Sequence, residues 1–251
     1  MLPTNSDLRV TETSWKKLQS LMPSRIDLDR VALIRDRDRD WLADRRNVEE
    51  LIPQLGLNGE GMEEYPAWLH PYCGNGLRIW QYPVQFAPYL CDLAALGIRS
   101  YLEIGIRHGG TFVATAEYLD RFAPLERAVG IDILPCPGFD DYRAMNPRAE
   151  FVRVDTQSEA WPRLMERLGA IDLVLIDAFH DETQCRREFQ SVSRQARAIA
   201  IHDVVHSEFD GVRKVWGEIK SSGQWECREY VDQYDLPQSY MGIGLAIRRE
   251  Q

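Results

Sequence analysis

Three features are missing from this chain: a long apolar run, a set of paired cysteines and a surplus of basic residues. No stretch approaches the roughly 20 apolar residues that cross a membrane, so we expect no membrane partner. Five scattered cysteines, an odd number without a Cys-x-x-Cys pair, argue against a disulfide framework and a zinc cluster. A net charge of −9 argues against a nucleic-acid partner, because phosphate binding needs a concentrated basic face. The first residues also lack the basic start and apolar core of a secretory signal, so we expect a cytoplasmic protein with a small-molecule substrate.

From about residue 100 onward, short apolar runs alternate with stretches of helical spacing. Such alternation predicts a parallel sheet with right-handed crossovers. The predicted parallel strands are residues 100–104, 128–133, 150–154, 171–176 and 198–201. Two further strand-like runs, 225–231 and 241–248, predict an antiparallel hairpin that completes the sheet. The expected fold class is α/β, a Rossmann-like seven-stranded and mainly parallel sheet with helices on both faces and a helical N-terminal extension.

The first part of the chain is less regular than the rest. Helical patterns cover residues 12–21 and 30–55, and a stretch rich in Gly and Pro follows from 58 to 76. That stretch is either a lid over a site or a plain connector. We therefore predict an N-terminal extension at 1–76 that serves as a substrate lid or an oligomer contact.

The main domain is predicted at residues 77–251. It opens with apolar residues at helical spacing over 77–96, and this pattern ends at Gly97, just before the first strand. Most of the aromatic side chains in that helix are expected in the core.

A glycine-rich turn follows the first predicted strand. Glu103 ends the strand, and Gly105 and Gly109 let the backbone turn sharply into a helix at about 111–119. A ligand can approach such a turn closely. The Glu-x-Gly-x-x-x-Gly spacing differs from the Gly-x-Gly-x-x-Gly of dinucleotide folds, and it places an acid where a pyrophosphate would require neutral or positive neighbours. The turn therefore predicts a nucleotide cofactor with a cationic part.

On this turn, together with Asp132 at the end of the second strand, the chain resembles the class I S-adenosylmethionine-dependent methyltransferases. The resemblance covers roughly residues 77–249. It implies that Glu103, Gly105 and Gly109 lie beneath the methionine part of the cofactor. It also implies that Asp132 accepts hydrogen bonds from both ribose hydroxyls, a task that suits a carboxylate.

Two further positions follow from the same resemblance. Asp155 comes after the third strand, where the family's acid accepts the exocyclic amino group of adenine. Gln81, between Trp80 and Tyr82, precedes the first strand, in a segment that borders the cofactor in related enzymes. Any one of these residues alone could be a turn or a helix cap. Their order at successive strand ends favours a ligand site, because open α/β sheets bind ligands at that edge.

The fourth and fifth strands bring four titratable residues to the same sheet edge. Asp177 and His180 follow the fourth strand, and His202 and Asp203 follow the fifth. This pattern resembles the metal-dependent branch of natural-product and sugar O-methyltransferases and cephalosporin-hydroxylase-like proteins, which implies a divalent metal held by Asp177, His202 and Asp203. That branch commonly has two acids where this chain has His-Asp, and imidazole suits metals softer than magnesium. His202 could instead lie beside the metal or line the pocket, and without a metal the two acids would orient substrate and cofactor.

His180 is predicted as the general base, with Asp177 beside it in the catalytic centre. An imidazole titrates near neutral pH and can take a hydroxyl proton as the oxygen attacks the methyl group. In the sugar-methylating relatives, a histidine three residues after the metal acid has this task. The alternative is that His180 caps the helix predicted at 182–191, and His206 could line the substrate pocket.

These observations predict an S-adenosylmethionine-dependent O-methyltransferase for a hydroxylated small molecule, assisted by magnesium or manganese. Related enzymes often self-associate, so a homo-oligomer is expected. The alternatives are an N- or C-methyltransferase, a cephalosporin-hydroxylase-like biosynthetic protein, a nicotinamide-dependent oxidoreductase and a non-catalytic cofactor-fold subunit. The glycine spacing and the terminal hairpin disfavour the oxidoreductase. A wide separation of Asp177 from Asp203 would favour the non-catalytic subunit.

Overall fold

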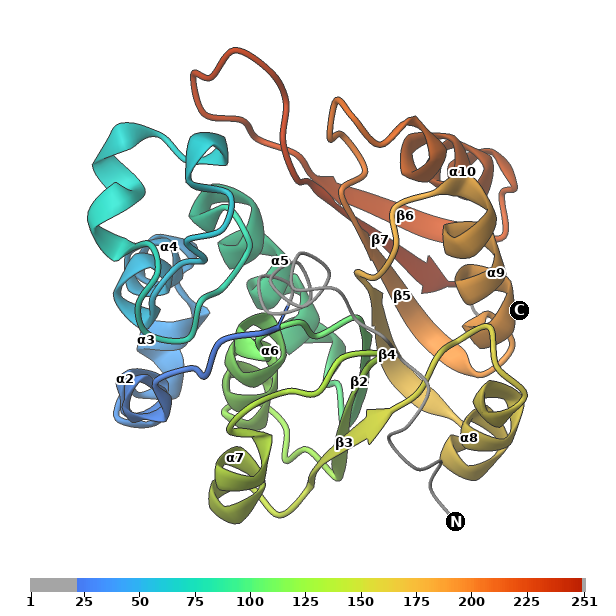
Figure 1. Cartoon of the computed structure of the whole chain (residues 1–251), viewed down its shortest axis with the longest axis horizontal. Coiled ribbons are helices and arrows are strands. Elements are labelled where there is room, and N and C mark those ends of the chain that lie inside the picture. The colour runs from blue at the N-terminus through green and yellow to red at the C-terminus, as the bar shows by residue number, and fades with distance from the viewer. Residues whose placement is uncertain (1–21, 250–251) are drawn as a thin grey trace, which may run out of the picture.

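The computed structural model describes residues 22–249, and their core is a sheet of seven strands in the order β3-β2-β1-β4-β5-β7-β6 (Figure 1). The strands are β1 (Ser100–Ile104), β2 (Arg127–Asp132), β3 (Ala149–Arg153), β4 (Ile171–Ile176), β5 (Ala196–His202), β6 (Trp225–Tyr230) and β7 (Ile243–Arg248). Strands β1 to β5 pair in parallel, whereas β7 runs antiparallel to both β5 and β6. The predicted α/β fold with an antiparallel C-terminal hairpin is confirmed.

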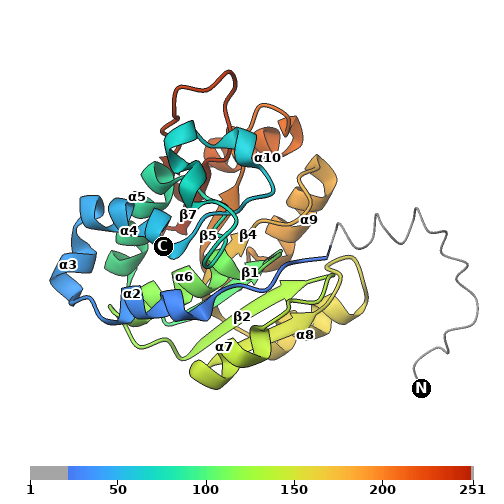
Figure 2. The ribbon, with the colours of Figure 1, turned by 60° about the vertical axis from the view of Figure 1, so that its left-hand side comes forward.

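Helices cover both faces of this sheet (Figure 2). One face packs against α5 (Pro83–Leu96), α6 (Gly110–Asp120) and α7 (Phe139–Met145). The other face packs against α8 (Ala160–Leu168), α9 (Glu182–Val192) and α10 (Asp210–Ser221). Across residues 22–249, no helix combines the length and the apolar character that crossing a membrane requires.

Alternate residues of each strand enter two different cores. In β4, Leu173 and Leu175 belong to the core beneath α5 to α7, while Val174 and Ile176 belong to the core beneath α8 to α10. Successive side chains of a strand point to opposite faces, and here both faces are covered. The strands therefore need continuous apolar runs, and their carboxyl ends are left to carry polar residues at one edge.

Short helices from the N-terminal part lie beside α5 and α6, on the side of the molecule coloured blue to cyan in Figure 1. They are η1 (Leu28–Val31), α2 (Ala32–Arg35), α3 (Arg39–Ala43), α4 (Arg45–Leu55), η2 (Met62–Glu64) and η3 (Ala67–Tyr72). Leu51 of α4 and Phe86 of α5 belong to the same apolar cluster as Leu173 of β4. The core thus runs without interruption from these helices to the sheet.

The helical pattern predicted over 30–55 is divided into several helices. Asp38 accepts a hydrogen bond from the backbone N–H of Trp41, and Asp44 accepts one from the backbone N–H of Arg46. Each aspartate is an N-cap that starts a new helix, because its side chain satisfies a backbone donor in the first turn.

The helix predicted from residue 77 begins only at Pro83. Before it, Ile79 forms a parallel bridge to Leu57, which keeps this segment extended. Pro83 then stands in the first turn, where a missing N–H has no cost and the fixed φ suits a helix. The helix predicted at 12–21 lies outside the described residues.

Candidate active site

The turn between β1 and α6 brings the ends of two strands together. Gly105 has a φ of +89°, and a Cβ at this position would lie 2.2 Å from the carbonyl oxygen of Asp177 and 2.7 Å from the Cα of Ala178. The sequence suggested that this glycine allows a ligand to approach closely, but here its close neighbour is the chain itself. Gly105 is needed for β1 and β4 to meet, so a side chain here would disturb the fold before it blocked a ligand. Gly109, also at φ +89°, is the N-cap of α6.

A cavity of about 420 Å³, the Asp132 cavity, opens at the carboxyl ends of β1 to β4. Both carboxylate oxygens of Asp132 accept backbone hydrogen bonds at 2.8 Å, one from Arg107 in the glycine turn and one from Leu134. The chain therefore fixes this carboxylate in place. Two apolar side chains on the cavity wall are largely exposed, Ile133 at 60% and Phe179 at 72%, and together they offer a surface for a flat ring.

Asp155 is exposed and lines the same cavity, where its carboxylate accepts a hydrogen bond from the backbone N–H of Gln157 at 2.8 Å. A buried polar network that sequence reasoning missed also lines it. The Thr156 hydroxyl and the Gln184 amide both donate to one oxygen of Glu188, at 2.8 and 2.6 Å. No short motif marks these residues, because the network joins a loop after β3 to the inner face of α9.

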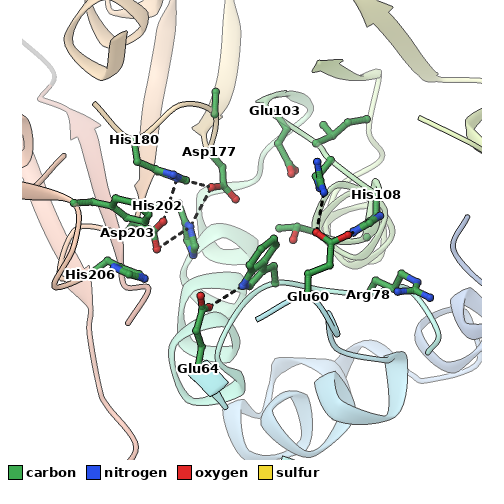
Figure 3. A pocket seen from close by; sticks show the side chains of 18 residues that line it. Glu60, Glu64, Arg78, Glu103, His108, Asp177, His180, His202, Asp203 and His206 are labelled. Carbon is green, nitrogen blue, oxygen red and sulfur yellow. Dashed lines mark hydrogen bonds and ion pairs between the residues drawn. The ribbon is translucent and has the colours of Figure 1, made fainter. Parts of the chain in front are cut away.

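A second cavity of about 390 Å³, the cluster cavity, meets the first at the glycine turn. Gly105, Arg107, Asp177 and Ala178 line both cavities. Glu103 faces the cluster cavity from β1 (Figure 3), is only 1% exposed, and accepts a hydrogen bond from the Tyr101 hydroxyl. Burial raises the pKa of Glu103 well above its usual range.

Four residues at the ends of β4 and β5 converge in this cavity, and we call them the Asp-His cluster: Asp177, His180, His202 and Asp203 (Figure 3). The Nε2 atom of His180 lies 3.4 Å from Asp177 and 3.1 Å from Asp203. The Nδ1 atom of His202 lies 3.1 Å from Asp177 and 3.3 Å from Asp203. The two aspartates are therefore close enough to share one ligand. The wide separation that would have favoured a non-catalytic subunit is not found.

The charges of the Asp-His cluster depend on one another. Burial alone would lower the pKa of His180 and of His202, but the carboxylates of Asp177 and Asp203 outweigh burial and raise both, that of His202 well above its usual range. Burial would also raise the pKa of Asp177, yet His202 and His180 hold it below its usual range. The imidazoles and the carboxylates thus stabilise one another's charged forms, and a divalent cation would compete with protons for these groups.

The cluster fits a divalent metal ion by its donor chemistry. Its four ligand atoms lie within 4.8 Å of one another, and no other such group occurs among residues 22–249. His202 is buried, and neither of its ring nitrogens forms a hydrogen bond of good geometry in the described part of the chain. Two oxygens and two nitrogens form a mixed set that suits manganese, iron or zinc better than magnesium.

The roof of the cluster cavity comes from the Gly- and Pro-rich segment and the residues after it. Glu60 spans the glycine turn, with one carboxylate oxygen 2.9 Å from Arg107 and the other 3.1 Å from His108. Glu64 accepts a hydrogen bond from the Trp80 indole at 2.9 Å. The sequence suggested a lid here but no particular side chain, because these contacts join residues far apart in the chain.

The wall predicted at residues 80–82 is only partly as expected. Trp80 lines the cluster cavity. Gln81 is fully buried, and neither atom of its amide forms a hydrogen bond to the described residues. Tyr82 donates to the backbone carbonyl of Glu64 and so supports the roof.

Comparison with known proteins supports the same architecture. No protein-family model matches the chain, and no curated protein matches it significantly. An O-methyltransferase from Bacillus cereus, solved in complex with SAH, is 16% identical and superposes with a TM-score of 0.51, covering 88% of this chain and 96% of that one. Cofactor-bound Rv0187 from MTB is 21% identical and superposes with a TM-score of 0.52, and the match covers 85% of this chain and 92% of that one. This chain has the methyltransferase fold. The fold implied by the sequence resemblance is thereby confirmed.

Proposed function

We propose that the protein is an S-adenosylmethionine-dependent O-methyltransferase that acts on a hydroxyl of a sugar or natural product with the help of a divalent metal ion. The observation that carries this proposal is the junction of the two cavities at Gly105 and Arg107. One cavity is lined by Asp132 and Asp155, the acids expected to bind an adenosine, and the other holds the Asp-His cluster expected to bind a hydroxyl. A methyl group at the junction would stand between them.

The Asp132 cavity would hold the adenosine part of the cofactor. Each oxygen of Asp132 already accepts one backbone hydrogen bond and keeps a lone pair for a ribose hydroxyl. Ile133 and Phe179 would pack on the adenine ring, and Asp155 would accept its amino group. The ribose would thus lie at the end of β2 and the adenine at the end of the neighbouring β3.

The methionine part would extend along the glycine turn into the cluster cavity, over Glu103. At the far end, Arg78 and the N-terminal turn of α6 would bind its carboxylate. Arg78 is half-buried, forms no hydrogen bond or ion pair with the described residues, and has a strained φ of +59°. Sequence reasoning missed this arginine, because a lone basic residue before a helix carries no motif. Gln81 would stand behind this wall.

The acceptor hydroxyl would lie against the Asp-His cluster. Asp177, His202 and Asp203 would hold the metal, which when bound would lower the pKa of the acceptor hydroxyl. His180 would then take the hydroxyl proton on its Nε2 atom while the oxygen forms its bond to the methyl carbon and the carbon–sulfur bond breaks. The products are the methyl ether, the demethylated cofactor and a protonated imidazole.

His180 is assigned as the base because it is the most accessible member of the cluster. Its side chain is 26% exposed, against 16% for Asp177, 5% for His202 and 6% for Asp203. Its ring stacks on Phe209 at 4.5 Å between centroids, which fixes the direction of Nε2. Asp181, not His180, caps α9 through the backbone N–H groups of Thr183 and Gln184. The cap that competed with the base assignment is thus supplied by another residue.

Two measurements test the proposal. Calorimetry with S-adenosylhomocysteine should give a saturable heat, and methyl-labelled S-adenosylmethionine screened against hydroxylated sugars and aglycones should give an O-methylated product by mass spectrometry. Absence of cofactor binding would overturn the proposal. A product methylated on nitrogen or carbon would support the proposed cofactor but would show that the proposed acceptor, a hydroxyl, is wrong. Analytical ultracentrifugation would test the homo-oligomer that we also propose.

A further inference from the structure

The roof of the cluster cavity carries a carboxylate that forms no ion pair with the described residues. Glu64 is half-buried and lines the cavity, across from Asp177 and Glu103 (Figure 3). Within the described residues, the hydrogen bond recorded for its carboxylate comes from the neutral indole of Trp80, at 2.9 Å. Its other oxygen is left for a ligand.

The other acids of this cavity either face cationic groups or are fully buried. Glu60 lies between Arg107 and His108. Glu103 is buried against the Tyr101 hydroxyl. Asp177 and Asp203 face the two imidazoles of the Asp-His cluster. Among the described residues, Glu64 is therefore the acid of this cavity that is only half-buried and forms no ion pair, so a ligand can reach its carboxylate.

We propose that the acceptor is a hydroxylated amine, an amino alcohol or amino sugar, whose ammonium group binds the Glu64 carboxylate at the oxygen that does not accept the Trp80 indole N–H. This inference rests on the proposed function for the position of the acceptor hydroxyl, which would lie on the Asp-His cluster while the amine lies on the roof. Glu64 is a binding residue in this arrangement and takes no part in the chemistry.

The side chains around Glu64 suit an ammonium group. A carboxylate binds an ammonium group through a charge-assisted hydrogen bond, which is stronger than a bond between neutral groups. The Glu64 side chain folds over Gly61, where a Cβ would lie 2.9 Å from its carboxyl carbon, so the lack of a side chain at residue 61 leaves space for this carboxylate. Burial and the nearby Asp203 also raise the pKa of Glu64, which means that a bound cation would stabilise its charged form.

The test measures the preference for an amine over its neutral counterpart. Dissociation constants would be obtained by NMR titration with magnesium and S-adenosylhomocysteine present, for ethanolamine against ethylene glycol, dopamine against catechol, and D-glucosamine against D-glucose. In the parent protein, at least one amine should bind about tenfold more tightly than its partner. Glu64→Gln, which keeps an oxygen for the Trp80 indole, should reduce that ratio to about one. Glu63→Gln, a neighbouring exposed acid, is the matched control and should keep the parental ratio.

The outcomes separate this inference from the proposed function. Equal binding or no binding of all three pairs by the parent protein, or a preference that survives Glu64→Gln in a protein with parental melting temperature, would overturn it. The inference would also be overturned if Glu64→Gln lost affinity for S-adenosylmethionine as strongly as for the amine, because Glu64 would then bind the ammonium group of the cofactor. If S-adenosylhomocysteine itself does not bind, the proposed function fails, and the amine preference can still be measured without it.

Discussion

The two cavities that meet at Gly105 hold their carboxylates in different ways. In the Asp132 cavity, backbone N–H groups of Arg107 and Leu134 fix the acid that faces the ligand. In the cluster cavity, Asp177 and Asp203 are held by two imidazoles, and that of His202 forms no well-formed hydrogen bond with the described residues. The Asp132 carboxylate is held by the chain itself, whereas the Asp-His cluster, in the function proposed above, would exchange protons for a cation. Single substitutions in the Asp132 cavity should therefore each lower ligand affinity by a limited amount. A single substitution in the Asp-His cluster should disturb all of its members, because their charges depend on one another.

The largest effect should come from breaking the Asp-His cluster. Asp177→Asn should abolish manganese binding, since one of only two charged ligands is lost. Even a substitution of a residue that only hydrogen-bonds to a metal ligand costs about 10- to 100-fold in metal affinity or activity, and loss of a ligand should cost more. Calorimetry with manganese measures the binding, and methyl transfer after chelation and metal return measures the consequence. Glu208→Gln, an exposed acid near the cluster, should behave as the parent. Methyl transfer that persists after exhaustive chelation would show that the metal assignment is wrong.

The next effect separates the base from the metal ligands. His180→Ala should lower turnover by roughly 10²- to 10⁴-fold, the usual contribution of a positioned base. It should leave S-adenosylhomocysteine affinity unchanged and manganese affinity nearly so, because His180 is the most exposed group of the cluster. Loss of manganese binding in His180→Ala would make His180 a metal ligand, and parental turnover across pH would remove it from the mechanism.

The contrast between the cavities also explains what the sequence could predict. Each predicted strand lies within about two residues of the observed one because buried parallel strands require continuous apolar runs. Residues at the carboxyl ends of those strands, such as Asp132 and Asp177, could be placed at one edge from the topology alone. Their partners are also local in sequence or lie on neighbouring strands.

The roof could not be predicted in the same way. Glu60 reaches Arg107 across 47 residues, and Glu64 reaches Trp80 across 16, with no periodic pattern to join them. The packing of Gly105 against Asp177 and Ala178, which follow β4, was also not predicted, although Gly105 does line both cavities as the sequence suggested. Contacts that depend on how separate segments pack in three dimensions cannot be predicted from the spacing of residues in the sequence.

The Asp132 cavity should respond more gently to substitution. Asp132→Ala should weaken S-adenosylhomocysteine binding by about 1 to 3 kcal/mol, since it removes an acceptor for the ribose and frees the Arg107 N–H. Asp155→Ala should cost less, because Asp155 is exposed and water can replace it. Calorimetry on both variants shows which substitution weakens S-adenosylhomocysteine binding more. Equal or inverted losses would assign the ribose to another acid, and no loss in Asp132→Ala would make it a structural residue of the turn.

The smallest effect is a pH dependence of stability that arises from the cluster. The pKa values of His180 and His202 are raised in the folded protein, so their imidazolium forms stabilise it fully below the ordinary histidine value of about 6.5. This contribution is lost as pH rises through the folded-state pKa values. With a chelator present, the melting temperature should therefore fall as pH rises above the ordinary histidine value of about 6.5, by roughly 2 to 4 °C for each kcal/mol lost. Manganese needs deprotonated imidazoles, so the stabilisation it gives should grow over the same range. His202→Gln should remove most of both trends, and a manganese affinity independent of pH would show that the imidazoles are not exchanged for the metal.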